Sequence, residues 1–144
     1  MIKLGTVVFV SSLFAGVNFS TAGDTSSNGL WKLSGGKLTV RVEQCYGDKL
    51  CAKVAALAKP LRDDGTPKLD ENNPNQSLRK RPVIGIQLID GMVPNGANKW
   101  KGKIYNADDG HTYSAYAKLN GNSLQVKGCW GPFCKNLEFS RVNQ

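Results

Sequence analysis

The chain has 144 residues, of which 40% are hydrophobic and 21% are charged, and its formal net charge is +8. This length favours one domain with a single core. Beyond the first twenty or so residues, no stretch is apolar enough to span a membrane as a helix, which argues against an integral helical membrane protein. The positive charge favours anionic partners such as lipid headgroups, cell-wall polymers or acidic ligands, although it also serves solubility alone.

The first 22 residues have the pattern of a signal peptide. Lys3 precedes an apolar run from Leu4 to Phe19, and the small residues Ser20 and Ala22 suit signal peptidase, so we expect cleavage near Ala22. The run is short for a membrane anchor, which needs about 20 residues. We therefore predict a periplasmic or secreted protein in which residues 23–144 form one domain. Export also argues against nucleic acid as a partner.

Eight segments alternate between apolar and polar side chains and are predicted to be β-strands. In the second of them, for example, Leu38, Val40 and Val42 share one face. Asp109-Gly110 and Asn120-Gly121 are typical of tight hairpin turns, and Asp90-Gly91 is interpreted as another turn. The predicted strands are Leu30–Leu33, Lys37–Cys45, Lys49–Ala58, Val83–Ile89, Asn98–Tyr105, Thr112–Leu119, Ser123–Trp130 and Leu137–Val142.

Eight antiparallel strands with one apolar side each bury those sides by closing into an up-and-down barrel, which also removes exposed edges. The opposite sides carry lysine, threonine and glutamine, so this all-β barrel is polar outside, unlike a transmembrane barrel. Arg141 breaks the pattern, because it falls in phase with Leu137 and Phe139. We expect Arg141 to stack on Trp31, since first and last strands meet when a barrel closes. The alternative is that Arg141 is exposed at the strand end.

A long polar connection, Lys59 to Arg81, separates the third strand from the fourth. A loop of this length in a small domain is a functional lid or a mobile segment. Asn73-Pro74 resembles a helix N-cap followed by proline at the first helical position, so we predict a short helix of one or two turns through Leu78–Lys80. Arg79 and Arg81 would then lie at its carboxyl end and complement the helix dipole.

The four cysteines lie in pairs beside tight connections, which predicts the disulfides Cys45–Cys51 and Cys129–Cys134. An exported chain reaches an oxidising compartment in which such bonds persist. The alternative is a four-cysteine zinc site, but the spacings are wider than those usual for zinc ligands.

Signals for enzymatic chemistry are weak. The single histidine, His111, follows Asp108-Asp109-Gly110, and the chain has no nucleophile elbow, phosphate loop or dinucleotide fingerprint. The carboxylates of the polar loop have poor spacing for a calcium site and read as solvated charges; they are Asp63, Asp64, Asp70 and Glu71. We therefore expect no catalytic residues, cofactor or metal, and keep a hydrolase centred on His111 as a weaker hypothesis.

The candidate ligand-binding residues are aromatic or basic. Small barrels can hold one apolar ligand, and arginine would meet an acidic headgroup such as a carboxylate. Alternatively, the tryptophan fills the core, and the arginines form structural salt bridges or a solvated helix end. The candidates are Arg79, Arg81, Trp100, Tyr105 and Tyr113, with Tyr116 as a further aromatic side chain on the same hairpin.

A set of short motifs occurs in a fixed order along the chain. They are Gly29-x-Trp31, Asn73-Pro74, Leu78-Arg79-x-Arg81-Pro82-x-x-Gly85, Trp100-x-Gly102-Lys103-Ile104-Tyr105, Gly110-x-Thr112-Tyr113, Gly128-Cys129 and the closing Arg141. This pattern resembles the exported bacterial family called domain of unknown function 2147. The resemblance implies a lipocalin-like barrel in which a first-strand tryptophan packs under a last-strand arginine. Family members often carry Asp-Pro where this chain has Asn106-Ala107, which puts any role for an acid there in doubt.

Two functional hypotheses follow. The first, supported by fold analogy alone, is a calyx that binds a small apolar or amphipathic ligand, with Lys59–Arg81 as its lid or rim. The second is an interaction module that docks on an anionic component of the cell envelope, or on a protein, through its basic and aromatic outer face.

Overall fold

The computed structural model describes Gly16 and residues 26–143. The predicted signal peptide and its cleavage site, apart from Gly16, lie outside these residues. Within the described part of the chain, no helix has the length and apolar character needed to cross a bilayer.

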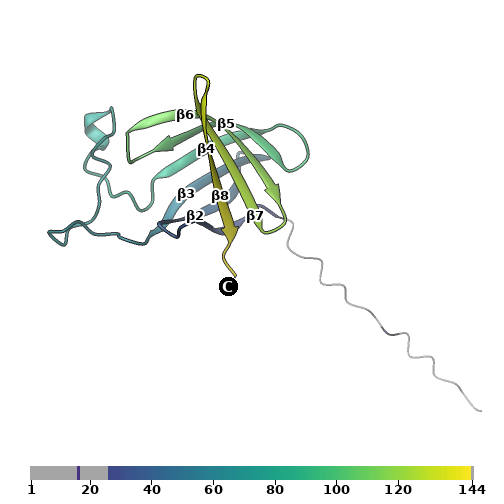
Figure 1. Cartoon of the computed structure of the whole chain (residues 1–144), viewed down its shortest axis with the longest axis horizontal. Helices are drawn as coiled ribbons and strands as arrows, with labels where there is room; N and C mark the ends of the chain where they lie inside the picture. The colour runs from purple at the N-terminus through teal and green to yellow at the C-terminus, as the bar shows by residue number, and fades with distance from the viewer. Residues whose placement is uncertain (1–15, 17–25, 144) are drawn as a thin grey trace, which may run out of the picture.

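Eight antiparallel strands close into a barrel in which each strand pairs with the next and β1 pairs with β8 (Figure 1). The predicted up-and-down barrel is therefore confirmed. Local alternation and turn chemistry account for seven of the eight strand pairings, because those neighbours in the sheet are also neighbours in sequence, and the β1–β8 pairing then closes the barrel. The strands are β1 (Gly29–Leu33), β2 (Leu38–Cys45), β3 (Lys49–Leu57), β4 (Gln87–Pro94), β5 (Lys99–Asn106), β6 (His111–Asn120), β7 (Ser123–Trp130) and β8 (Phe133–Arg141).

The fourth strand differs from its prediction. It covers Gln87–Pro94 instead of Val83–Ile89, so Asp90-Gly91 lies inside β4 and is not a turn. Gly91 has a φ of 85°, and the register of β3 on β4 shifts nearby, so this glycine accommodates a bulge-like irregularity. The last strand also begins earlier than predicted, at Phe133, because the hairpin pairs Trp130 directly with Phe133.

The predicted short helix of the long loop is present only as a 3-10 turn, and its N-cap differs from the prediction. A single 3-10 turn, η1 (Gln76–Leu78), is present, and its N-cap is Asn75, whose side chain accepts a hydrogen bond from the Ser77 N–H at 3.1 Å. Asn73 lies two residues before this cap and forms an Asx turn, in which its Oδ1 accepts from the Asn75 N–H at 2.8 Å while its Nδ2 donates to Asp70 at 2.8 Å.

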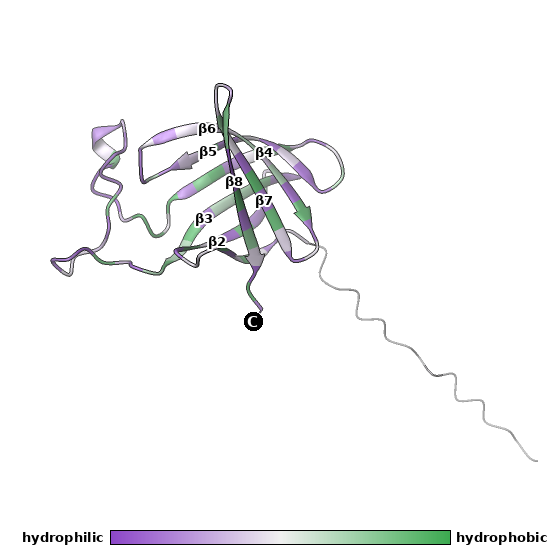
Figure 2. Ribbon diagram, in the orientation of Figure 1, coloured by the Kyte–Doolittle hydropathy of each residue, from purple (hydrophilic) through white to green (hydrophobic). Residues whose placement is uncertain are grey.

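The centre of the barrel is filled by side chains. Its strands alternate between hydrophobic and hydrophilic residues, shown in green and purple in Figure 2. Gly102 shows how closely the strands approach, since a Cβ there would lie 3.0 Å from Cγ and 3.2 Å from Cα of Met92. Buried members of the core are Trp31, Leu33, Val40, Val42, Leu50, Ala52, Ile89, Met92, Ala115, Ala117, Leu119, Leu124, Val126 and Phe139. Space for a ligand must therefore be sought at the barrel's ends.

Trp31 and Arg141 close the barrel as predicted. They are register partners on β1 and β8, and the guanidinium carbon lies 4.4 Å from the centre of the indole ring. The indole Nε1 donates to the Ser27 carbonyl at 2.9 Å, while Arg141 donates to the carbonyls of Ser26 and Asn28 at 2.6 and 3.2 Å. These hydrogen bonds hold residues 26–28 across one end of the barrel.

Both predicted disulfides are present. Cys45–Cys51 joins the ends of the β2–β3 turn with a Cα separation of 5.8 Å, and Cys129–Cys134 joins β7 to β8 at 4.1 Å. All four thiols are consumed, which leaves none for the alternative zinc site.

Candidate functional site

The two ends of the barrel carry different groups of the predicted site residues. The first end, called the Trp100 end, gathers residues 26–28, the β2–β3 turn and the start of β5. The second, called the loop end, gathers the long β3–β4 connection and the β5–β6 turn, as Figure 1 shows. Trp100 therefore lies at one end, whereas Arg79, Arg81, Tyr105 and Tyr113 belong to the other. The five predicted ligand-binding residues do not form one site.

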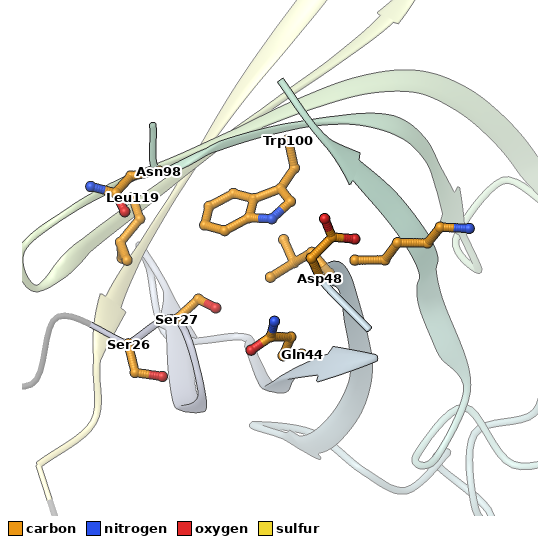
Figure 3. A pocket seen from close by; sticks show the side chains of 9 residues that line it. Ser26, Ser27, Gln44, Asp48, Asn98, Trp100 and Leu119 are labelled. Atoms are coloured by element: carbon orange, nitrogen blue, oxygen red, sulfur yellow. The ribbon is translucent and has the colours of Figure 1, made fainter. Parts of the chain in front are cut away.

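A cavity of about 170 Å³ opens at the Trp100 end (Figure 3). In Figure 3 the indole of Trp100 faces Gln44 and Ser27 across the opening, with Leu119 and Asp48 on its two sides. Six of its nine lining residues are polar, and the other three are Leu50, Trp100 and Leu119. The full lining is Ser26, Ser27, Gln44, Asp48, Lys49, Leu50, Asn98, Trp100 and Leu119.

Main-chain contacts position the rim of this cavity. Asn28 accepts a hydrogen bond from the backbone N–H of Gln44 at 2.8 Å, which fixes the amino-terminal segment against β2. Asn98 has a φ of 56°, a left-handed conformation that asparagine tolerates, and its carbonyl accepts from the Leu119 N–H at 2.9 Å. Hydrogen bonds thus hold the backbone of the polar rim in place, while Trp100 is half-buried and packs against the core.

The size and lining of the cavity limit what can enter it. Sites for drug-sized ligands usually measure about 300–1,000 Å³, so 170 Å³ suits a smaller molecule or one end of a longer molecule. The apolar residues offer contact to a hydrocarbon or ring. Lys49 offers the one positive charge among the lining residues, beside the negative charge of Asp48.

A buried carboxylate, Asp70, organises the loop end. Its Oδ1 accepts a hydrogen bond from the Tyr105 hydroxyl at 2.6 Å, and its Oδ2 accepts from Asn73 at 2.8 Å. Arg81 donates to the same Oδ2 through Nε at 2.9 Å and Nη2 at 2.8 Å. Burial raises the pKa of Asp70, but these hydrogen bonds and the charge of Arg81 outweigh it, so the pKa lies below its ordinary value.

The same cluster perturbs Tyr105 and occupies both candidate arginines. Burial, the hydrogen bond to Asp70 and the charge of that carboxylate raise the pKa of Tyr105 to about 12. Arg79 donates from Nε to the Asn73 carbonyl at 2.7 Å. Each arginine thus has a partner within the protein, as the alternative of a structural role predicted. In this arrangement they stabilise the loop.

The long loop is fastened to the β5–β6 turn. Asn72 donates from its side chain to the Asp108 carbonyl at 2.8 Å. Gly110 lies directly beneath this contact, since a Cβ there would stand 1.8 Å from the Asn72 carbonyl oxygen. Only a residue without a side chain allows this approach, so Gly110 serves loop docking as well as turn geometry.

Tyr113 belongs to a separate aromatic cluster at the loop end. Its ring lies 5.7 Å from that of Trp130, and the His111 ring lies 5.2 Å from Trp130. The Tyr113 hydroxyl donates to Asp109, which raises the pKa of Tyr113. Trp130 and Phe133 are 57% and 79% exposed. This cluster supports the hairpin tip and lies apart from Trp100.

Sequence reasoning missed the structural importance of Asp70 and the polar lining of the cavity. The polar loop around Asp70 predicts a solvated acid, but its side chain is fully buried. The available signal was the presence of Arg81 in the same loop, because an arginine held at a barrel end needs an acceptor.

Fold and closure together define the class of protein: a lipocalin-like barrel sealed by a tryptophan and an arginine. The chain belongs to the family described as "Uncharacterized protein conserved in bacteria (DUF2147)", whose model matches residues 29–141. It is also similar to a solved structure, "Protein HP1028 from the human pathogen Helicobacter pylori belongs to the lipocalin family". That similarity has 26% identity and a TM-score of 0.69, and covers 83% of this chain and 85% of the other. A comparison with curated proteins gave no match.

Proposed function

We propose that this protein binds a small amphipathic molecule at the Trp100 end of its barrel. The cavity beside Trp100 carries this proposal, because it combines an apolar wall with a polar rim. A lipocalin-like fold supports it by analogy.

The filled core changes where the ligand would lie. The sequence suggested a calyx inside the barrel, but Trp31, Leu50 and Met92 occupy the centre. A ligand would instead place its apolar part against Trp100 and its polar part among the residues of the rim. An acidic headgroup would meet Lys49, since Arg79 and Arg81 lie at the loop end.

Titration of tryptophan fluorescence with octanoate and with octanamide would test this proposal. Octanoate should bind more tightly than the amide, and Lys49→Gln should remove that difference, because the two probes differ in charge at the headgroup. Trp100→Phe should weaken binding, measured by calorimetry because the change removes a fluorophore, whereas Trp130→Phe, a matched change on the exposed hairpin, should leave the affinity unchanged. The site would be refuted if neither probe bound, or if the two tryptophan substitutions changed the affinity equally.

A second test concerns the natural ligand. Native mass spectrometry of protein purified from its own host should show an added mass that disappears after solvent extraction. The same sample tests the proposed export, because cleavage near Ala22 gives a mature chain beginning near Gly23. An uncleaved chain recovered from the cytoplasm would contradict the export proposal.

A further inference from the structure

A second hollow lies on the outer face of the sheet. It is a groove of about 500 Å³ that crosses β5, β6, β7 and β8. Its residues are Asn95, Lys99, Trp100, Tyr116, Ala117, Lys118, Gln125, Val126, Lys127, Asn136, Leu137 and Glu138.

Strand register explains the shape of this groove. One wall is a cross-strand row of outward side chains, Lys99, Lys118, Gln125 and Glu138, and the other is the row Tyr116, Lys127 and Asn136. The row between them is Trp100, Ala117, Val126 and Leu137, which lie in the core or pack against it, so the floor is main chain. Walls two residues apart stand about 7 Å from each other, and four strands span about 14 Å. These dimensions suit one extended chain.

The charge of this face favours an anionic chain. Apart from Arg141, which stacks on Trp31 in the barrel closure, the four strands together carry six lysines and one acidic side chain, Glu138. Glu138 accepts a hydrogen bond from the Ser123 hydroxyl at 3.1 Å. Among the described residues, the salt bridges involve Lys37, Arg62, Arg81 and His111, and none uses Lys99, Lys118 or Lys127. These three lysines therefore present their charge to solvent.

The uncharged groups of the groove favour a sugar chain. Tyr116 is 51% exposed and offers a ring face to a sugar ring. Asn95, Gln125 and Asn136 carry amides, which both donate and accept hydrogen bonds and so match hydroxyl groups. Polyphosphate would use the lysines but has neither hydroxyl groups nor rings. We propose that this groove binds an acidic polysaccharide through carboxylate contacts to its lysines, a function separate from the small-molecule cavity.

Calorimetric titration with oligogalacturonate, its methyl-esterified form and polyphosphate would test this proposal. Oligogalacturonate should bind, and affinity should fall as salt rises. Replacing both Lys118 and Lys127 with glutamine should weaken binding about tenfold, the effect of losing two exposed charge contacts. The control, Lys32→Gln with Lys53→Gln, makes the same charge change at exposed positions of β1 and β3 and should stay within about twofold. Tyr116→Ala should weaken the binding of oligogalacturonate but not that of polyphosphate.

Three results would overturn the proposal. Equal binding of the esterified polymer would show that carboxylates are not recognised. If the groove variant (Lys118→Gln with Lys127→Gln) and the control variant (Lys32→Gln with Lys53→Gln) lost affinity equally, net charge and not the groove would determine binding. Binding of polyphosphate or anionic vesicles at least as tight as that of oligogalacturonate, with Tyr116→Ala without effect, would show that no sugar is recognised.

Discussion

Removing the carboxylate of Asp70 should detach the long loop. Asp70→Ala deletes the acceptor of four hydrogen bonds, one from Tyr105, one from Asn73 and two from Arg81. Tyr105 and Asn73 would then lose their acceptor in a protected site, because Asp70 is fully buried and Asn73 is 5% exposed. The loop would lose the hydrogen bond that joins it to Tyr105 of β5, and the contacts from Asn73 and Arg81 that order it around Asp70.

The magnitude follows from burial. Breaking a buried ion pair by removing one partner costs about 3–5 kcal/mol. The Arg81 side chain is 37% exposed and can turn toward water, so its share is smaller. The donors of Tyr105 and Asn73 add about 1–3 kcal/mol between them. We expect Asp70→Ala to lower the free energy of unfolding by about 3 kcal/mol, or about 2 M in the urea midpoint if the m-value is about 1.5 kcal/mol/M.

The effect should depend on pH. Because the pKa of folded Asp70 lies below its ordinary value of 3.8, its contribution is present above that value and is lost as pH falls through the folded pKa. The difference in stability between wild type and Asp70→Ala should therefore be constant near neutral pH and shrink on acidification below about pH 4.

Urea unfolding and trypsin digestion measure the two consequences. Trypsin reports loop release directly, since the cleavable bonds after Arg79 and Lys80 lie in the loop. Asp63→Ala is the matched control, because Asp63 is an exposed acid of the same loop and should change stability by no more than about 0.5 kcal/mol. If Asp70→Ala matched this control in urea midpoint and digestion rate, the reasoning would be refuted.

Three further predictions concern close contacts and closure. Gly110→Ala should lower the free energy of unfolding by about 2–4 kcal/mol, because its Cβ would overlap the Asn72 carbonyl. Gly121→Ala, also at positive φ but in open space, should lower it by about 1 kcal/mol. Equal losses of stability in urea would contradict the contact. In ultraviolet titration, Tyr105 should ionise near pH 12, and its contribution to stability should be full below pH 10 and lost through pH 12. Native protein in which every tyrosine ionises near pH 10 would falsify this. Arg141→Met should lower the free energy of unfolding by about 1–2 kcal/mol, because it removes the cation above the closing indole and the hydrogen bonds to the Ser26 and Asn28 carbonyls. An unchanged thermal melt would show that this closure contributes nothing.

The sequence by itself determined the barrel, both disulfides and the Trp31–Arg141 closure. The strands and disulfides depend on local signals: alternation assigns each side chain to a face, and tight turns make consecutive strands neighbours. The Trp31–Arg141 contact follows from them, because a closed barrel brings its first and last strands together. The separation of Trp100 from Tyr105 was also implicit, because five residues of one strand extend about 17 Å. The turn predicted at Asp90-Gly91 was wrong, because the same dipeptide occurs in turns and in irregular strands.

Only the tertiary structure decided what the long loop does. Asp70 meets Tyr105 across 35 positions of sequence, and Asn72 meets Asp108 across 36. No periodicity encodes such contacts, so a buried carboxylate and a solvated one look alike in the sequence. The outer groove likewise depends on register across four strands, since alternation names the outward residues but does not align them. Burial and register arise when distant segments pack, and that packing also gives Arg79 and Arg81, two of the predicted ligand-binding residues, hydrogen-bond partners within the loop.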